Sequence, residues 1–282
     1  MLGVVPEEKV IGGKKEASPV TEADLIILDS NSTEKPAQRV LGVIPARLAS
    51  TRLPKKMLRR IAGRPMLEWV YEAAVRCPGL DATIVATDSS EIANLCLEHG
   101  WPFQMTSPDL PSGSDRVQAV AEEIPADIYV NIQGDEPLLQ PEHLSALLRP
   151  FLRAHVDVST LRVACPPESV NNPNVVKVVT SLDGRALYFS RSAIPFDRDH
   201  SHPGFWKHIG LYAYRADALY QFTCLPYGEL ERAERLEQLR FLENGIPVYV
   251  ETTDVDTVGV DTEEDLLAAE LMLGRQTHSP AL

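Results

Sequence analysis

The sequence predicts an α/β fold in which a Rossmann-like, mostly parallel sheet is flanked by helices and carries an antiparallel insertion. Short apolar runs rich in β-branched residues recur along the chain, as in strands that are buried on both faces. Segments with apolar residues at helical spacing separate these runs. Such alternation is typical of right-handed β-α-β units, whose crossovers place neighbouring strands parallel.

The first half of the organised chain contains most of these units. Pro45 ends the first apolar run, Pro65 opens the first helical segment, and Gly100 closes the second. The expected strands are 40–44, 82–87, 101–105 and 128–132, and the expected helices are 65–74, a segment through 92–96, and 115–124.

The second half changes in texture, and its strand-like runs at about 156–225 are expected to form an antiparallel insertion. Asp183-Gly184 is a typical hairpin turn between two of them. The expected strands are 156–163, 175–180, 186–189, 209–214 and 248–250, and the expected helices are 141–154, 229–242 and 262–273.

The chain has 282 residues, which at about 150 residues per domain allows two average domains or one large one. Residues 1–38 have only one short apolar patch, so we expect a flexible N-terminal extension there and a disordered tail at 276–282. The remaining residues, 39–275, are expected to form a single domain with the antiparallel subdomain at about 156–225.

Composition excludes several classes of protein. With 27 Lys and Arg against 40 Asp and Glu, the net charge is −13, which argues against nucleic acid or an anionic membrane surface as a partner. Four cysteines without a C-x-x-C pair indicate neither a disulfide framework nor a zinc site. No apolar run approaches the roughly 18 residues of a spanning helix, and charges at 7–16 rule out a signal peptide. We therefore expect a cytoplasmic protein without membrane insertion.

A basic loop, residues 45–56 (PARLASTRLPKK), follows the first expected strand. Ligands of open α/β sheets bind beyond the carboxyl ends of strands. Arg47 and Arg52 can each pair with phosphate through two parallel hydrogen bonds, and Lys56 adds a compact charge. On charge alone a solvated loop is the better interpretation, but this position favours an anion site. The loop is not a Walker A motif.

A second candidate site follows the expected strand 128–132, where the chain reads Gln133-Gly134-Asp135-Glu136-Pro137. A carboxylate at this place is suited to Mg²⁺, which binds one or two protein carboxylates together with substrate phosphate oxygens. Asp261, just before the last expected helix, is a candidate for the second carboxylate. Taken alone, Asp261 or Thr262 is more typical of a helix N-cap.

These motifs occur in an order that resembles the 3-deoxy-manno-octulosonate cytidylyltransferase (CMP-Kdo synthetase) family of nucleotide-sugar cytidylyltransferases. The similar blocks are VIPAR (43–47), ASTRLP (49–54), GRPM (63–66), VATD (85–88), QGDEP (133–137), NPNVVKVV (172–179), ALYFSR (186–191), HIGLYAYR (208–215), LEQLR (236–240) and GVDT (259–262). Any one block is a weak signal, but the ordered set spans about 40–273.

The resemblance implies a fold of the nucleotide-diphospho-sugar transferase type. It implies transfer of CMP from CTP to the anomeric hydroxyl of 3-deoxy-D-manno-octulosonate (Kdo), with release of pyrophosphate, for lipopolysaccharide biosynthesis. It further implies Mg²⁺ as the cofactor and a homodimer, with sugar binding and dimerisation in the 156–225 subdomain.

The resemblance also assigns roles to residues. The nucleotide would be bound by Ala46, Arg47, Arg52, Lys56, Ser112, Gly113 and Gln133, and the catalytic set would be Arg47, Arg52, Lys56 and Asp135. Mg²⁺ would be held by Asp135 and Asp261. The sugar would be bound by Gln133, Arg191, His208, Tyr212, Glu237 and Gln238. Among these, Arg191 suits the sugar carboxylate, whereas His208 taken alone is more typical of a structural hydrogen bond.

The chain departs from the family pattern at two places. Lys55 stands where the family commonly has glycine, which would either strengthen phosphate attraction or stiffen the loop. Ser114-Asp115 replaces the usual Thr-Glu, so the acid is one methylene shorter.

Three rival functions stay open. Two are cytidylyltransferases for another acidic sugar, 8-amino-Kdo or sialic acid. Residues 48–51 (LAST) argue against sialic acid, whose enzymes favour a glycine-rich continuation. The third is a non-catalytic nucleotide-binding module, which would not need both Asp135 and Asp261.

Overall fold

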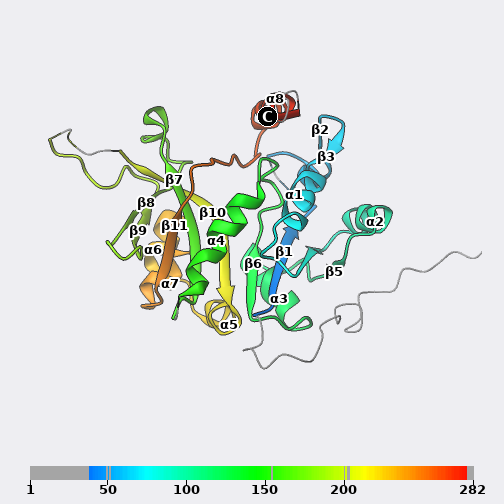
Figure 1. Ribbon diagram of the computed structural model, residues 1–282, viewed down its shortest axis with the longest axis horizontal. Coiled ribbons are helices and arrows are strands. Elements are labelled where there is room, and N and C mark those ends of the chain that lie inside the picture. Colours follow the sequence, from blue (N-terminus) through cyan, green and yellow to red (C-terminus); the bar gives the residue numbers. More distant parts are fainter. Residues whose placement is uncertain are drawn as a thin grey trace, which may run out of the picture.

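The computed structural model describes residues 38–277, except residues 49, 51, 154, 200, 202 and 203. The expected flexible extension and disordered tail lie almost entirely outside the described residues. Within the described part, the chain forms a nine-stranded sheet with helices on both faces (Figure 1).

The sheet confirms the predicted α/β class. Its order is β11-β7-β10-β6-β1-β4-β5, with β1 parallel to β4 and β6, β5 parallel to β4, and β11 parallel to β7. β10 is antiparallel to both of its neighbours in this order. The bounds are β1 (Val40–Ala46), β4 (Ala82–Thr87), β5 (Phe103–Met105), β6 (Ile128–Asn131), β7 (Val158–Ala164), β10 (Trp206–Arg215) and β11 (Val248–Thr252).

The predicted hairpin is present as β8 (Lys177–Thr180) and β9 (Ala186–Ser190). Gly184 takes a φ of 87° in its turn, a backbone region that favours glycine. β8 joins β10 through the pair Lys207 and Lys177, so the hairpin extends the central sheet. A second, small sheet pairs β2 (Arg60–Ile61) with β3 (Arg64–Pro65).

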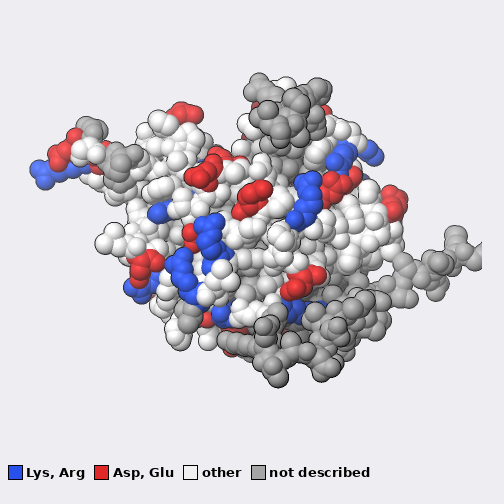
Figure 2. Space-filling model, viewed as in Figure 1, with Lys and Arg blue, Asp and Glu red and all other residues white. Residues whose placement is uncertain are grey.

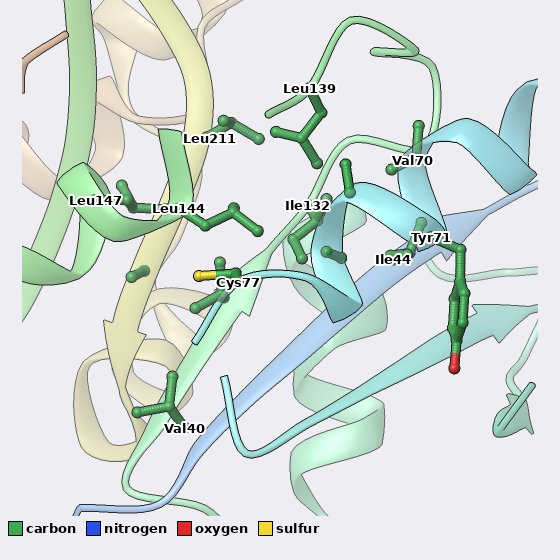
Figure 3. Close-up of a cluster of buried hydrophobic side chains, with 14 of the residues drawn as sticks. Val40, Ile44, Val70, Tyr71, Cys77, Ile132, Leu139, Leu144, Leu147 and Leu211 are labelled. Carbon is green, nitrogen blue, oxygen red and sulfur yellow. The ribbon is translucent and has the colours of Figure 1, made fainter. Parts of the chain in front are cut away.

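Helices cover both faces because alternate residues of the strands are apolar on both sides. In β1, Ile44 belongs to one buried cluster and Val43 to the other. The first cluster is covered by α1 (Met66–Val75), α2 (Ser90–His99) and α4 (Pro141–Leu148). The second is covered by α3 (Gly113–Ala121), α5 (Ala216–Cys224) and α7 (Leu239–Glu243). Figure 3 shows part of the first cluster, where Leu144 of α4 lies toward Ile132.

Several helices differ from the expectation, each for a local reason. The helix expected at 141–154 ends at Leu148 and continues as the 3₁₀ turn η3 (Arg149–Leu152), because Pro150 cannot donate a helical hydrogen bond. The helix expected at 115–124 begins at Gly113, because Ser112 caps it. α5 was not expected at all. The remaining 3₁₀ turns are η2 (Lys56–Leu58) and η4 (Pro167–Ser169).

The prediction of one helix at 229–242 is wrong. The stretch forms α6 (Glu229–Glu234) and α7, separated by Arg235, whose φ of 55° is left-handed. The helix propensity of these residues favours one unbroken helix. The carbonyls of Glu234 and Arg235, however, accept hydrogen bonds from the guanidinium of Arg191, and the helix is interrupted there. The break carries Glu237 and Gln238, two predicted site residues.

The last helix, α8 (Glu263–Thr277), packs on the end of the basic loop and on the segment that follows it. Leu266, Ala269 and Leu273 form a third buried cluster with Leu53 and Ile61. Residues 253–262, which have no helix or strand, connect β11 to α8 along the upper edge of the view in Figure 1.

Acidic and basic side chains are interspersed over the described surface that Figure 2 shows. A search of the described residues for a long, strongly apolar helix of the kind that crosses a bilayer found none.

Candidate active site

A cleft of about 890 Å³ opens beside β10, the loop after β6 and the 253–262 segment. Nine of the fourteen predicted site residues line it: Arg52, Gln133, Asp135, Arg191, His208, Tyr212, Glu237, Gln238 and Asp261. These residues lie far apart in the sequence, so the fold brings residues of separate motifs together in one cleft.

The two candidate metal ligands face one ammonium group. Nζ of Lys56 donates to Oδ2 of Asp135 at 2.5 Å and to Oδ1 of Asp261 at 2.9 Å, and its side chain is only 10% exposed. Burial lowers the pKa of Lys56, but the charges and hydrogen bonds of Asp135 and Asp261 outweigh it and leave the pKa raised. Lys56 is therefore a fixed cation between two carboxylates.

The backbone fixes the same two segments. The N–H of Val260 donates to the carbonyl of Asp135 at 2.9 Å, one residue before Asp261. Thr262, not Asp261, accepts from the helix at Asp265 N, while the Asp265 carboxylate accepts from the backbone N–H groups of Asp261 and Thr262. The carboxylate of Asp261 is thus left to Lys56 and Arg52.

Gly134 allows the loop after β6 to approach β1. A Cβ built there would lie 3.0 Å from Sδ of Met57, 3.2 Å from the carbonyl of Pro45 and 3.3 Å from Cγ2 of Ile44. The glycine of the QGDEP motif therefore keeps Asp135 against the end of β1 and the basic loop.

The basic loop is only partly directed at the cleft. Nη2 of Arg52 donates to Asp261 at 2.9 Å. Nη2 of Arg47 is buried and has no hydrogen-bond partner among the described residues, which leaves a guanidinium edge to be satisfied by a ligand. Lys55 takes the left-handed φ of 53°, where the family glycine would stand, and its Nζ donates to both carboxylate oxygens of Glu91. Lys55 thus holds α2 rather than entering the cleft.

Ser112 and Gly113 lie at the start of α3. The backbone N–H and Oγ of Ser112 donate to Asp115, whose own N–H donates back to Ser112 Oγ. The shortened acid therefore caps its own helix. Ser112 also lines a neighbouring cavity of about 460 Å³ that shares Glu237 with the main cleft.

A β-bulge in β10 shapes the sugar side of the cleft. The register with β7 shifts between Ile209 and Tyr212. Oγ1 of Thr160 lies 3.1 Å from the carbonyl of Ile209 and 2.8 Å from that of Leu211, so the one proton of this buried hydroxyl is shared between two carbonyls of the bulge. The carbonyl of Gly210 instead accepts from Nε2 of Gln133 at 3.1 Å, which orients that amide.

His208 and Tyr212 flank this bulge. Nε2 of His208 lies 2.9 Å from Thr160 Oγ1 and 3.0 Å from the hydroxyl of Tyr212. Burial, followed by the charge of Lys207, lowers the pKa of His208 to about 3. The imidazole is therefore neutral at physiological pH, and it can interact with a ligand through hydrogen bonds but not through a positive charge.

Arg191 lies where β9 leads into the cleft, and backbone carbonyls hold its guanidinium. Nε donates to Glu234 O at 2.7 Å, Nη1 to Pro173 O at 3.0 Å and Nη2 to Arg235 O at 3.3 Å. No carboxylate neutralises this guanidinium within 4.0 Å among the described ion pairs. Its positive charge and remaining N–H groups are therefore available at the cleft wall.

Glu237, which lies in the break between α6 and α7, forms a hydrogen bond with the first turn of α3. Its Oε1 accepts from Oγ of Ser114 at 3.1 Å. Burial raises the pKa of Glu237, and the Ser114 hydrogen bond partly opposes this. The break between α6 and α7 thus presents a carboxyl group to the segment that starts α3.

Some functional residues were not predicted. Thr160 belongs to none of the sequence motifs, because its role, a hydrogen bond to carbonyls of the β10 bulge, exists only in the folded chain. Lys207 lines the cleft, donates to Asp256 Oδ1 at 2.8 Å and to Thr257 O at 2.9 Å, and thereby ties the 253–262 segment to β10. The HIGLYAYR block begins at the next residue, His208, so the position of Lys207 beside this motif could have pointed to a place in the site.

These features define a class: a mostly parallel α/β sheet with a basic loop after β1 and paired carboxylates at the cleft is the architecture of a nucleotidyltransferase. Comparison with known proteins agrees. A sequence model of the family described as cytidylyltransferase matches residues 41–253. The chain belongs to the cytidylyltransferase family.

Individual relatives narrow the similarity. The chain is 57% identical over 235 residues to 3-deoxy-manno-octulosonate cytidylyltransferase of Acidobacterium capsulatum, covering 83% of this chain and 96% of the relative. It is 55% identical over 236 residues to the protein of the same name from Koribacter versatilis, covering 83% and 90%.

Two solved structures are also similar. CMP:2-keto-3-deoxy-manno-octonic acid synthetase complexed with CTP superimposes with a TM-score of 0.82 at 38% identity, covering 84% of this chain and 99% of that one. The 4-diphosphocytidyl-2C-methyl-D-erythritol synthase of Anaerococcus prevotii has a TM-score of 0.59 at 12% identity, with the same coverage, and shares the fold.

Proposed function

We propose that this protein transfers CMP from CTP to the anomeric hydroxyl of Kdo, releasing pyrophosphate, in the supply of activated sugar for lipopolysaccharide. The observation that supports this proposal most strongly is that Asp135 and Asp261, both bonded to Lys56, line the same cleft as Arg191. The names of its relatives support the same sugar and nucleotide.

The nucleotide side would use the basic loop and the start of α3. Arg47, Arg52 and Lys56 would bind the triphosphate, because their donors neutralise the charge that develops on the leaving pyrophosphate. Ala46, Ser112, Gly113 and Gln133 would contact the nucleoside. The partnerless Nη2 of Arg47 supports a ligand there.

Mg²⁺ is the metal that the residues fit. Asp135 and Asp261 already converge on the single cation of Lys56, and carboxylate oxygens are its preferred protein ligands. Among the described residues there is no group of three or more His, Cys, Asp or Glu side chains that could hold a metal. Phosphate oxygens and water would therefore complete the set. When bound, the metal would polarise the attacking hydroxyl and neutralise phosphate charge.

The sugar side would use Arg191 for the carboxylate. Gln133, His208, Tyr212, Glu237 and Gln238 would bind hydroxyl groups. The neutral state of His208 supports hydrogen bonding, and the three carbonyl bonds of Arg191 support a rigid, preorganised charge with N–H groups left for the sugar.

We also propose a homodimer in the cytoplasm. Exposed apolar side chains near the β8–β9 hairpin support self-association: Leu182 (in its turn), Leu187 and Phe196. Analytical ultracentrifugation should give twice the chain mass, and a strict monomer would contradict this proposal.

A substrate competition tests the sugar. With CTP and Mg²⁺, equal concentrations of Kdo, 8-amino-Kdo and sialic acid should give CMP-Kdo as the main product by mass spectrometry. Preference for 8-amino-Kdo or sialic acid would replace the proposed substrate. Binding of CTP without pyrophosphate release on any of the three would favour a non-catalytic nucleotide-binding module.

A further inference from the structure

We infer that His143 is a positioning residue that sets the spacing of the two metal-binding carboxylates by fastening the 253–262 segment to the start of α4. His143 lies outside the cleft and within none of the family motifs described above. The inference rests on the proposed metal site, although one of its tests does not.

Both ring nitrogens of His143 are used, and the side chain is fully buried. Nδ1 lies 3.0 Å from the backbone N of Gln140, and Nε2 lies 2.9 Å from the carbonyl of Val255. Because a backbone N–H can only donate, Nδ1 is the acceptor and Nε2 carries the proton. The imidazole is thus a neutral bridge with one defined tautomer.

This bridge joins the two chain segments that carry the carboxylates. Gln140 ends the loop that contains Gln133 and Asp135, and Val255 lies in the 253–262 segment, which contains Asp261. That segment has no helix or strand, so individual hydrogen bonds fix its path, and the backbone bond from Thr253 N–H to Arg162 O at 3.0 Å ties its first residue to β7. Lys207 holds its middle and Val260 bonds Asp135 directly, whereas His143 holds its beginning.

Outer groups that orient metal ligands commonly change metal affinity by about 10–100-fold when removed. If the beginning of the segment is released, the hydrogen bond between Val260 N–H and Asp135 O opens more often. Asp261 then spends less time beside Asp135. Metal affinity should fall although no ligand changes.

The matched variants separate the bridge from helix capping. His143→Asn keeps a short acceptor for Gln140 N–H, as Asp115 does at the same position of α3. Its amide is too short to reach Val255, so only the inter-segment bond is lost. Leu147→Val is the control, because Leu147 is buried on the same helix and does not contact the segment through a hydrogen bond.

The first measurement is hydrogen exchange of the peptides covering 253–262, by mass spectrometry of the full chain without metal or substrate. The second is Mn²⁺ binding, without and with CTP, by electron paramagnetic resonance, because phosphate oxygens would complete the metal's ligand set. In His143→Asn we expect exchange at Val260 to be about tenfold faster, as for the loss of one hydrogen bond. We expect about tenfold weaker Mn²⁺ binding. Leu147→Val should change neither by more than about twofold.

Unchanged exchange in a folded His143→Asn would overturn the inference. Equal effects in Leu147→Val would also overturn it, because they would show general destabilisation. Faster exchange with unaltered Mn²⁺ affinity would keep the fastening but refute its effect on the metal. Wild-type protein that binds no Mn²⁺ even with CTP present would count against the proposed metal site, while the exchange result would still decide the bridge.

Discussion

Nζ of Lys56 lies 2.5 Å from Oδ2 of Asp135, in a side chain that is 10% exposed. The same nitrogen contacts Asp261. One largely buried cation thus lies between the two carboxylates and offsets their repulsion, while Arg52 pairs with Asp261 from a more exposed position.

Lys56→Met should expose that repulsion. We expect a loss of about 1–3 kcal/mol in unfolding free energy without metal, because a largely buried charge pair is broken while the partly exposed Asp261 keeps some solvent screening. Added Mg²⁺ should restore part of it. Urea unfolding with and without Mg²⁺ checks this, and an equal loss under both conditions would contradict a shared cation position.

Arg191→Ala should affect the sugar more than the nucleotide. We expect the KM for Kdo to rise by about 10–100-fold, as for a lost charge-assisted pair of about 1.5–3 kcal/mol, with the KM for CTP within about threefold. Steady-state kinetics with each substrate varied gives both values. Because Arg191 also bonds three backbone carbonyls, Arg191→Lys serves as the folded control. Equal rises in both KM values would refute the assignment.

The buried carboxyl group of Glu136 should make the stability of the protein depend on pH. Burial first, and then the charge of Asp135, raises the pKa of Glu136 to about 8 from its ordinary 4.5. Between these values the folded chain keeps a proton that the unfolded chain releases, so stability falls as pH rises from 5 to 8.

Glu136→Gln should remove that slope and stabilise the protein at pH 8 by on the order of a few kcal/mol, with little change at pH 5. Urea unfolding at both pH values measures it. Glu142→Gln, an exposed residue of α4, is the control and should follow wild type. A slope that persists in Glu136→Gln would show that another group causes it.

Gly134→Ala should disturb the loop that carries Asp135. The added Cβ would meet Met57, Pro45 and Ile44 at 3.0 to 3.3 Å, so we expect a loss of about 1–3 kcal/mol and lower activity. Gly259→Ala, in the same cleft but with nothing within 4 Å of its Cβ, is the matched control and should remain active. Thermal unfolding and pyrophosphate release distinguish the two, and identical behaviour would argue against close packing at Gly134.

The sequence predicted the strands most reliably, because burial on both faces gives an apolar run that turn residues bound at each end. β4 has the expected bounds, 82–87, and the hairpin around Gly184 follows from its turn chemistry. The parallel core could therefore be predicted from local pattern alone.

The sugar side could not be predicted in the same way, because its shape depends on contacts between distant residues. The stretch 229–242 has helical propensity throughout, yet tertiary bonds to Arg191 interrupt it. The bulge in β10 requires Thr160, and the 253–262 segment requires His143 and Lys207. None of these residues shows its role in a local motif.

Asp261 illustrates the limit for the metal site. A carboxylate before a helix is more typical of a cap, and only the structure shows that Thr262 and Asp265 cap α8 while Asp261 meets Lys56.

Pyrophosphate release from CTP and Kdo, with and without Mg²⁺, in wild type and Asp135→Asn, tests the central claim most directly. We predict turnover that requires Mg²⁺ in wild type and falls by at least about 100-fold in Asp135→Asn, because the variant loses a carboxylate that would hold the metal. Undiminished turnover in a folded Asp135→Asn would contradict the proposed metal site and the mechanism built on it.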